Sequence, residues 1–298
     1  MKGFNVKRIL VPIDFSETSL LALEHAGFMA KLFKADLYLT HVIEISEYTY
    51  SIYDPAVKFL DLDEIRKIVI EKLDELAKRT RKEYGVHVNT ICTNGRIPRD
   101  IVDTSKENAI DLIVMGTHGA SGSEEFFIGS NAHRTVTLSA CPVITVQTHA
   151  KKTGFRNILL PIDNTLHSRQ KVDYAIEIAK HYHSKIHVLG LPESNADEDM
   201  KKFMIKLEAV EHAIKKAGLT YSIETIFSKN IAREAMDYAP KVNADLTVIM
   251  TDHESNLTGM FLGVRAKQVV NHSKVPVLSI KPVEGEYDSI DLSAASPF

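Results

Sequence analysis

A glycine-rich loop at residues 116–130 has the residue types and spacing to hold a phosphate group. Gly116 and Gly119 are separated by two residues, and after nine further residues Gly129 is followed by Ser130. The loop follows an apolar, strand-like segment and leads into a helix-like segment. Glycines let backbone N–H groups approach an anion closely, and a helix N-terminus adds unpaired N–H donors and a favourable dipole. The pattern therefore predicts a phosphate-binding loop.

Two common phosphate-binding motifs do not describe this loop. A Walker A loop needs Gly-Lys followed by Ser or Thr, and a dinucleotide fingerprint needs Gly-x-Gly-x-x-Gly. Neither pattern occurs at residues 116–130. The plain alternative is that these glycines only turn the chain at the edge of a sheet.

Length and composition indicate a soluble globular protein with room for two domains. The chain has 298 residues, of which 44% are hydrophobic and 25% charged, and a domain averages about 150 residues. A formal charge of −3 gives no general reason to bind nucleic acid or an anionic membrane. No apolar run approaches the roughly 20 residues that span a bilayer. We expect a cytoplasmic protein with no nucleic-acid or membrane partner, in which Cys92 and Cys141 are buried free thiols.

The chain contains the same sequence pattern twice. The segment Arg8-Ile-Leu-Val-Pro-Ile-Asp14 recurs as residues 157–163, and the Cys-Pro step at 141–142 recurs as Val-Pro at 275–276. The landmarks keep their order, which predicts a tandem repeat. We expect one domain at residues 1–148, a second at 155–282, and a tail at 283–298. Most of the extra length of the first copy falls within residues 44–62, which carry several aromatic residues.

Apolar runs alternate with amphipathic helical patterns in each copy. This alternation predicts an α/β fold with a parallel sheet, right-handed crossovers and helices on both faces. In the first copy the expected strands are Arg8–Ile13, Asp36–Val42, His87–Cys92, Leu112–Met115 and Val143–Val146. The expected helices are Ser19–Phe33, Leu62–Tyr84, Pro98–Asn108 and Ser130–Leu138.

The glycine spacing and the repeat together resemble the nucleotide-binding universal stress proteins. The resemblance covers nearly the whole chain, in duplicate. It implies two tandem flavodoxin-like, Rossmann-like doubly wound domains, each with five parallel strands in the order 3-2-1-4-5. Members of this family pair through their last strands. The resemblance therefore implies that Val143–Val146 and Val277–Ile280 meet antiparallel as an intramolecular pseudo-dimer, and a homodimer of chains stays open.

The same resemblance implies that the first copy binds ATP, with Mg²⁺ as a candidate companion ion. Asp14 would contact the ribose or adenine side, and the backbone of His41 and Val42 would face adenine. The glycine loop would hold the ribose and the phosphates. The residues implied to contact the nucleotide are Pro12, Asp14, His41, Val42, Met115, Gly116, Gly119, Gly129, Ser130 and Asn131.

Two acidic residues in the loop run against this interpretation. Glu124 and Glu125 would repel a triphosphate unless they point away from it or hold a divalent cation. A solvated acidic loop is the simpler interpretation. No His-Glu-x-x-His or Cys-x-x-Cys pattern occurs, so we expect no dedicated metal site.

The second copy lacks most of the small residues of the phosphate-binding loop, which we call the cradle. Alignment of the repeats places Met250 at the position of Gly116, His253 at that of Gly119 and Val264 at that of Ser130. Large side chains block close backbone approach, and valine removes a hydroxyl donor. We expect the second copy to bind ATP poorly or not at all.

Three functional hypotheses follow. The first is an ATP-binding regulator of a stress response that acts on an unidentified client protein with little turnover. The second is a slow ATPase or phosphotransferase that uses His118 or Ser130. The third is a ligand-free scaffold whose contact surface is the aromatic segment with Tyr48, Tyr50 and Tyr53. The missing Walker lysine and general base argue against efficient turnover, and the intact glycines argue against a complete loss of binding. We assign no catalytic residue.

Overall fold

The computed structural model describes residues 4–44, 62–117, 129–251, 253–256 and 259–283. Residues 45–61 of the aromatic segment, residues 284–298 of the tail and four residues of the glycine loop named above, His118, Gly119, Glu124 and Glu125, lie outside this range.

The first half alternates strands and helices along the chain. Its elements are β1 Arg8–Pro12, α1 Glu17–Phe33, β2 Asp36–Glu44, α2 Leu62–Tyr84, β3 Val88–Gly95, α3 Ile97–Glu107, β4 Leu112–Gly116, α4 Ser130–Leu138 and β5 Val143–Val146.

The second half repeats this order with short additions. Its elements are β6 Asn157–Asp163, the 3₁₀ turn η2 Leu166–Arg169, α5 Lys171–Tyr182, β7 Lys185–Leu191, α6 Asp197–Lys216, β8 Tyr221–Thr225, α7 Ile231–Tyr238, the 3₁₀ turn η3 Ala239–Val242, β9 Leu246–Met250, β10 His253–Asn256, β11 Gly259–Leu262, α8 Val264–His272 and β12 Val277–Ile280.

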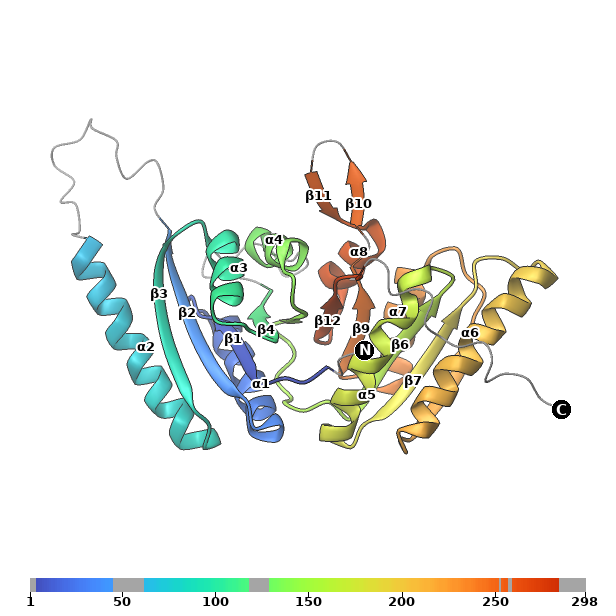
Figure 1. Ribbon diagram of the computed structural model, residues 1–298, viewed down its shortest axis with the longest axis horizontal. Helices are drawn as coiled ribbons and strands as arrows, with labels where there is room; N and C mark the ends of the chain where they lie inside the picture. Colours follow the sequence, from blue (N-terminus) through green and yellow to red (C-terminus); the bar gives the residue numbers. More distant parts are fainter. Residues whose placement is uncertain (1–3, 45–61, 118–128, 252, 257–258, 284–298) are drawn as a thin grey trace.

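One ten-stranded sheet runs through both halves, in the order β3-β2-β1-β4-β5-β12-β9-β6-β7-β8. The halves join where β5 and β12 pair antiparallel, with Ile144 opposite Leu278. The other ladders of this sheet are parallel. The predicted strand order and the intramolecular pseudo-dimer are therefore confirmed. Figure 1 shows the two halves side by side, with α2 and α6 at opposite ends.

The inner strands form because their side chains are mostly apolar on both faces. Ile9, Leu10 and Val11 of β1 are fully buried, as expected for a sheet covered by helices on both sides. The expected elements match the structure within a few residues. Helix α1 begins at Glu17, earlier than expected, because Ser16 caps it by accepting a hydrogen bond from the N–H of Ser19.

Within each half, an equivalent aspartate holds the first and fourth strands together in the same way. Asp111 accepts hydrogen bonds from the N–H groups of Lys7 and Arg8. Its counterpart Asp245 accepts them from the N–H groups at positions 156 and 157. Each carboxylate therefore ties the segment that enters the first strand of its half to the start of the fourth. The repeat extends to these polar contacts as well as to the apolar pattern.

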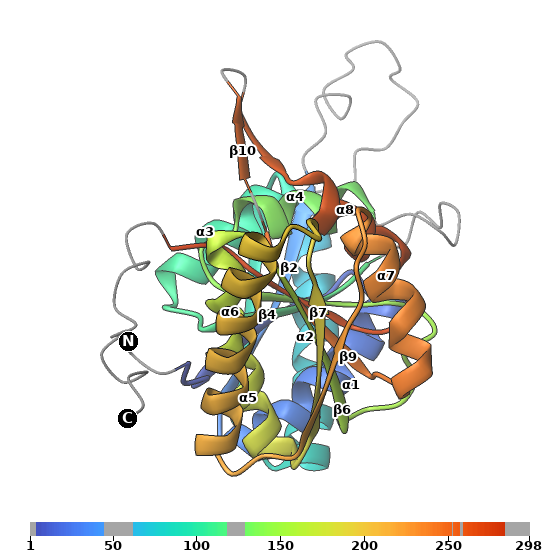
Figure 2. The ribbon, with the colours of Figure 1, turned by 90° about the vertical axis from the view of Figure 1, so that its right-hand side faces the viewer.

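The halves also touch beside helices α1 and α5, away from the strand pairing. Phe4 packs on Tyr174 of α5 with ring centroids 4.6 Å apart. His25 of α1 is buried, and its Nε2–H donates to the carbonyl of Ala150 in the connecting segment. His25 also stacks on Phe155. The linker is thus held through His25 and Phe155. Figure 2 views the molecule from the end of the second half, with α6 in front.

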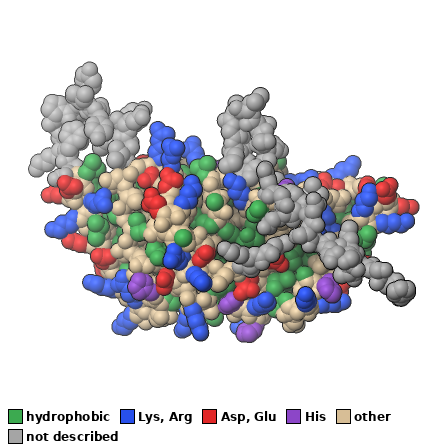
Figure 3. Space-filling model, viewed as in Figure 1, with side chains coloured by type: hydrophobic (Ala, Val, Ile, Leu, Met, Phe, Trp, Pro, Cys, Tyr) green, Lys and Arg blue, Asp and Glu red, His purple; other side chains and the backbone are tan. Residues whose placement is uncertain are grey.

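The surface mixes charges of both signs. Figure 3 shows basic and acidic side chains interspersed over both halves on the face it displays. Among the helices that the structure describes, none combines the length and the apolar character needed to cross a membrane.

The strand pairing leads to a first prediction. Residues 1–148 expressed alone should dimerise, because the short apolar β5 would otherwise be an exposed edge. Ile144→Pro removes a ladder donor and should leave this fragment monomeric. Light scattering at high concentration measures both states, and a wild-type fragment that stays monomeric would contradict the role given to β5.

The buried histidine leads to a second prediction. Burial lowers the pKa of His25 below its ordinary 6.5, so below that pH the unfolded chain binds a proton that the folded chain resists. The free energy of unfolding should therefore be unaffected by His25 above pH 6.5, and it should fall as the pH drops from 6.5 toward the pKa of His25 in the folded state. His25→Gln keeps an N–H donor without titrating. It should reduce the pH slope of the unfolding free energy by up to about 1.4 kcal/mol per pH unit.

Urea unfolding at several pH values measures this slope. Some slope should remain, because burial also lowers the pKa of His133 and His187. An unchanged slope in His25→Gln would show that His25 is not a source of acid sensitivity.

Candidate functional site

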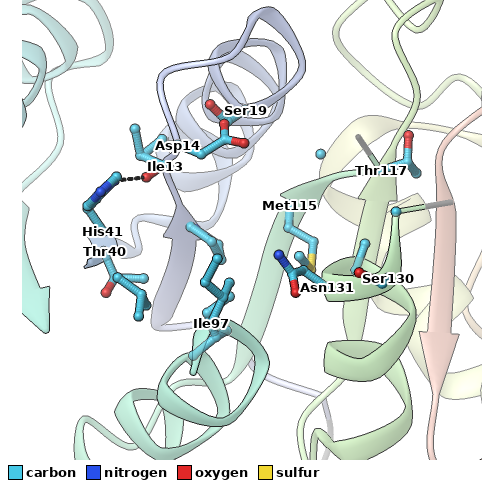
Figure 4. Close-up of a pocket in the computed structure, with 16 residues that line it drawn as sticks. Ile13, Asp14, Ser19, Thr40, His41, Ile97, Met115, Thr117, Ser130 and Asn131 are labelled. Carbon is cyan, nitrogen blue, oxygen red and sulfur yellow. Dashed lines mark hydrogen bonds between the residues drawn. The ribbon is translucent and has the colours of Figure 1, made fainter. Parts of the chain in front are cut away.

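A cavity of about 170 Å³ lies in the first half at the carboxyl ends of β1, β2 and β4. This is the switch point of the strand order, where open α/β sheets bind ligands. Figure 4 shows the side chains around it. Every predicted site residue that the structure describes lines this cavity: Pro12, Asp14, His41, Val42, Met115, Gly116, Gly129, Ser130 and Asn131.

The turn after β1 holds Asp14 at the cavity. Its Oδ1 accepts hydrogen bonds from the N–H of Ser16 at 3.0 Å and from the Ser16 hydroxyl at 2.5 Å. Phe15 between them has φ of 64°, a left-handed conformation that is uncommon for a bulky residue. The turn therefore places the Asp14 carboxylate by a constrained backbone and by two donors.

The backbone of Val42 extends beyond the ladder between β1 and β2. That ladder ends where Pro12 lies opposite Thr40, and the carbonyl of Thr40 accepts a hydrogen bond from the N–H of Ile13. Alternate residues of a strand direct their backbone groups to the same side. The N–H and C=O of Val42 therefore point toward β1 past its end, where the described chain offers them no ladder partner.

His41 is held differently. The parallel register pairs it with Cys92 of β3, and alternation from Leu37, whose N–H bonds the carbonyl of His87, directs the His41 backbone to β3. Its Nδ1–H donates to the carbonyl of Ile13 at 2.6 Å, as Figure 4 shows. The two residues expected to offer backbone groups to adenine therefore differ. The backbone of Val42 faces the cavity side of β2, whereas the backbone of His41 faces β3 and its side chain holds the turn after β1.

The N-terminus of α4 supplies donors. Gly129 is the N-cap and provides no side-chain cap. The first backbone bond of the helix runs from the N–H of His133 to the carbonyl of Gly129. The N–H groups of Ser130, Asn131 and Ala132 therefore precede the intrahelical bonds, where an anion is favoured.

Apolar side chains that the sequence interpretation missed complete the wall. Ile97 and Ile101 of α3 line the cavity together with Met115 of β4. Ile101 and Met115 belong to the cluster of buried apolar residues on this face of the sheet, and the partly buried Ile97 packs against it. The signal for them was the amphipathic pattern of α3, which turns one apolar face toward the strands.

Gly116 has a packing role that the sequence did not indicate. A Cβ at this position would lie 2.9 Å from the backbone carbon of Thr18 in α1. The first turn of α1 can approach the end of β4 only because residue 116 has no side chain. The glycine is therefore required by the fold, apart from any approach of a phosphate.

The equivalent site of the second half is nearly closed. Met250 stands where the first half has Gly116, and it is buried. The helix after the first strand starts later, at Lys171, and the short turn η2 precedes it. A bulky side chain at the end of β9 leaves no room for a turn as close as that of α1. The remaining cavity is about 40 Å³.

Side chains within the second half also neutralise one another at this site. Arg265 of α8 lies 2.7 Å from the carboxylate of Glu193 and 3.7 Å from that of Asp163. Burial alone would raise the pKa of Asp163, but the charge of Lys171 and nearby hydrogen bonds hold it below its ordinary value. The Nζ of Lys206 donates to the backbone carbonyl of Asp163. The acidic group is thus already compensated from within.

The chain after β9 forms a hairpin. His253 begins β10, which pairs antiparallel with β11, and His253 lies opposite Leu262. Backbone groups in this hairpin bond one another and do not form an open cradle. The predicted degeneration of the second copy agrees with this geometry, and its effect on nucleotide binding stays a prediction.

Comparison with known proteins gives consistent matches. The family model described as the universal stress protein family matches residues 5–147 and again residues 154–281. A universal stress protein of Methanocaldococcus jannaschii is 34% identical over 149 residues, 49% of this chain and 85% of the relative. Universal stress protein YxiE of Bacillus subtilis is 38% identical over 148 residues, 47% of this chain and 98% of the relative.

A solved structure extends the likeness to both halves. A universal stress protein from Archaeoglobus fulgidus has a TM-score of 0.72 over 95% of this chain and 99% of its own, at 20% identity. At that identity the match shows the shared fold.

The close contact at Gly116 leads to a third prediction. Gly116→Ala should destabilise the protein by about 1–3 kcal/mol, because the added methyl meets backbone that must move. Urea unfolding without ligand measures this cost. Ala140→Ser, which alters an exposed side chain, is the control and should stay within about 0.5 kcal/mol of the wild type. Equal stability of the two variants would refute the packing role of Gly116.

Proposed function

Since the chain belongs to the universal stress protein family, we propose that its first half binds one adenine nucleotide, ATP, as a regulatory module with little turnover. The observation that carries this proposal is the convergence of five segments on one cavity: the ends of β1, β2 and β4, the first turns of α3 and the start of α4. They supply an unpaired backbone edge, apolar walls and helix N–H donors within the same space.

The base is expected between the apolar walls. Ile97, Ile101 and Met115 can cover a flat ring. The N–H of Val42 is a donor and its C=O an acceptor, which complements the N1 acceptor and N6 amino donor of adenine. This pairing needs no side chain, so it depends on the end of β1 leaving Val42 beyond the ladder.

The phosphates are expected at the N-terminus of α4. The N–H groups that precede the first intrahelical bond and the helix dipole favour an anion there. No lysine or arginine is among the described residues that line the cavity. Phosphate charge is therefore met by backbone donors and, in our proposal, by Mg²⁺ bound to the nucleotide.

The lack of lysine and arginine among the described lining residues also favours nucleotide binding over catalysis. Phosphoryl transfer depends on cationic groups that neutralise the developing charge and on a group that orients the nucleophile. His41, a candidate base by type, has its Nδ1–H engaged by Ile13. We propose that nucleotide occupancy, rather than turnover, changes how the protein meets a client during stress.

Calorimetric titration with ATP and Mg²⁺ tests this function. The stoichiometry should be near one per chain, since the second half is filled by Met250 and by its own charges. Gly129→Val places a side chain where the phosphate approaches and should abolish the binding heat. Gly263→Val, the matched change at the N-cap of α8, should leave it intact.

Other results would change the assignment. A stoichiometry near two would mean that the second cradle opens, and no heat with any adenine nucleotide would sink the proposal. Clear magnesium-dependent release of phosphate, lost in His118→Ala, would favour an enzyme instead.

A further inference from the structure

The second half contains a cavity of about 410 Å³ at the amino ends of β9 and β12. It lies between α7 with the turn η3 and the end of α8, and these two helices pack against each other (Figure 1). We name it the amino-end cavity. The small second cradle lies at the other, carboxyl end of β9. Ala235 and Val269 lie between the two spaces and line both.

The backbone around this cavity has a matching counterpart in the first half. The N–H groups of Ile110 and Ala244 each bond back to the helical turn that precedes them, at 2.9 Å. The N–H groups of Ile113 and Thr247 each bond the carbonyl of the proline that precedes the last strand, at 3.0 Å. The residues that line the cavity therefore have definite counterparts in the first half, and the side chains can be compared position by position.

Three of these positions hold isoleucine in the first half and a smaller residue in the second. Ile101, Ile110 and Ile113, all buried in the first half, correspond to Ala235, Ala244 and Thr247. Met236 is larger than its counterpart Val102, but it is half-buried at the side of the cavity. Loss of buried methylene groups leaves a void unless the neighbours collapse into it. The cavity thus lies where the second half lacks side chains that fill the first.

The interior of the cavity is apolar apart from one free hydroxyl. Ala235, Ala244 and Val269 supply apolar surface. Thr247 is 2% exposed, and its hydroxyl has no hydrogen-bond partner among the described residues. The other lining hydroxyl, of Ser273, already donates to a backbone carbonyl at 2.8 Å. A buried polar group without a partner costs free energy, so a ligand that bonds the Thr247 hydroxyl is favoured.

The charged groups of the cavity lie at its mouth. Asp237, His272 and Lys274 are exposed, and Asp237 lies 3.5 Å from Arg233. These groups are of both signs and remain in water. The described interior therefore offers no charge to pair with a buried ion, and burying an unpaired charge is costly. An uncharged ligand fits this lining best.

We propose that the amino-end cavity binds a small uncharged organic molecule with an apolar body and one hydrogen-bonding group. The apolar body packs on the alanines, Val269 and Met236, and the polar group bonds the Thr247 hydroxyl. An apolar cavity of about 150 Å³ admits benzene, so this larger space admits a compound of one or two rings. The site lies in the half to which no nucleotide is assigned, and the proposal does not depend on nucleotide binding.

Three probes that share one ring and differ in charge test the proposal on the full chain: benzyl alcohol, benzylamine and benzoate. NMR of methyl-labelled methionines locates the binding, because Met236 lines this cavity and Met115 lines the nucleotide cavity. Met236→Leu assigns the signal. Benzyl alcohol should shift the Met236 signal and leave the Met115 signal in place. It should bind about fivefold or more tightly than either charged probe.

Variants that copy the first half close the cavity. Thr247→Ile should weaken benzyl alcohol at least about tenfold and raise the midpoint of thermal unfolding by about 1–4 °C, because it fills a void. Ala244→Ile is a second, independent closure from the neighbouring position. Thr247→Val keeps the volume and removes only the hydroxyl. It should weaken benzyl alcohol about fivefold while the shift of the Met236 signal persists.

Three outcomes would overturn the proposal. The first is a Met236 signal that benzyl alcohol leaves unchanged, including the case in which only the Met115 signal shifts. The second is tighter binding of benzylamine or benzoate than of benzyl alcohol, which would show that a charge selects the ligand. The third is a pair of folded variants, Thr247→Ile and Ala244→Ile, that bind benzyl alcohol as the wild type does.

Discussion

The antiparallel pairing of β5 with β12 is the contact on which the architecture depends. Each of these strands is four residues long and buried throughout, so neither could end a sheet in water without exposing apolar side chains and unpaired backbone. Their pairing turns two five-stranded sheets into one. Because the strands of the two halves run in opposite directions at this junction, each half keeps a cradle at its own carboxyl ends. The outer strands β3 and β8 are then the two edges of the sheet, and Arg66 and Arg81 of α2 bond outward carbonyls of β3.

Within this shared frame, a few residues decide whether a cradle is open. Both helix starts have a glycine N-cap and no side-chain cap, but only the first half has Gly116, which admits the first turn of α1. The second half has Met250 in place of that glycine, and Arg265 at its helix start is bound to Asp163 and Glu193. The strand order and the aspartate clamps are the same in both halves. The two cradles therefore differ mainly through side chains placed on equivalent strands.

Much of the fold could be predicted from the sequence, because the spacing of apolar residues along the chain reflects which side chains are buried in each strand or helix. The resemblance to the universal stress proteins, which the glycine spacing and the repeat carry, implied the residues that line the cavity, and the ends of β1, β2 and β4 meet at one edge of the sheet as the switch-point rule requires. The sequence could not distinguish the Val42 backbone from that of His41, because the difference lies in where β1 stops relative to β2. Nor could it reveal that Arg66 and Arg81 cap β3, since long side chains on an exposed helix face look merely solvated until their reach is known.

The difference between the two cradles affects how the proposed nucleotide site would respond to the concentration of its ligand. In a symmetric homodimer every substitution alters both sites at once, and two like sites across one interface can respond cooperatively. In a tandem chain the residue at position 250 can change without a change at position 116, so one cradle can close while the other is retained. With the single nucleotide site proposed above, occupancy would rise with ligand concentration along a simple hyperbola, and it would not shift when the protein itself is diluted.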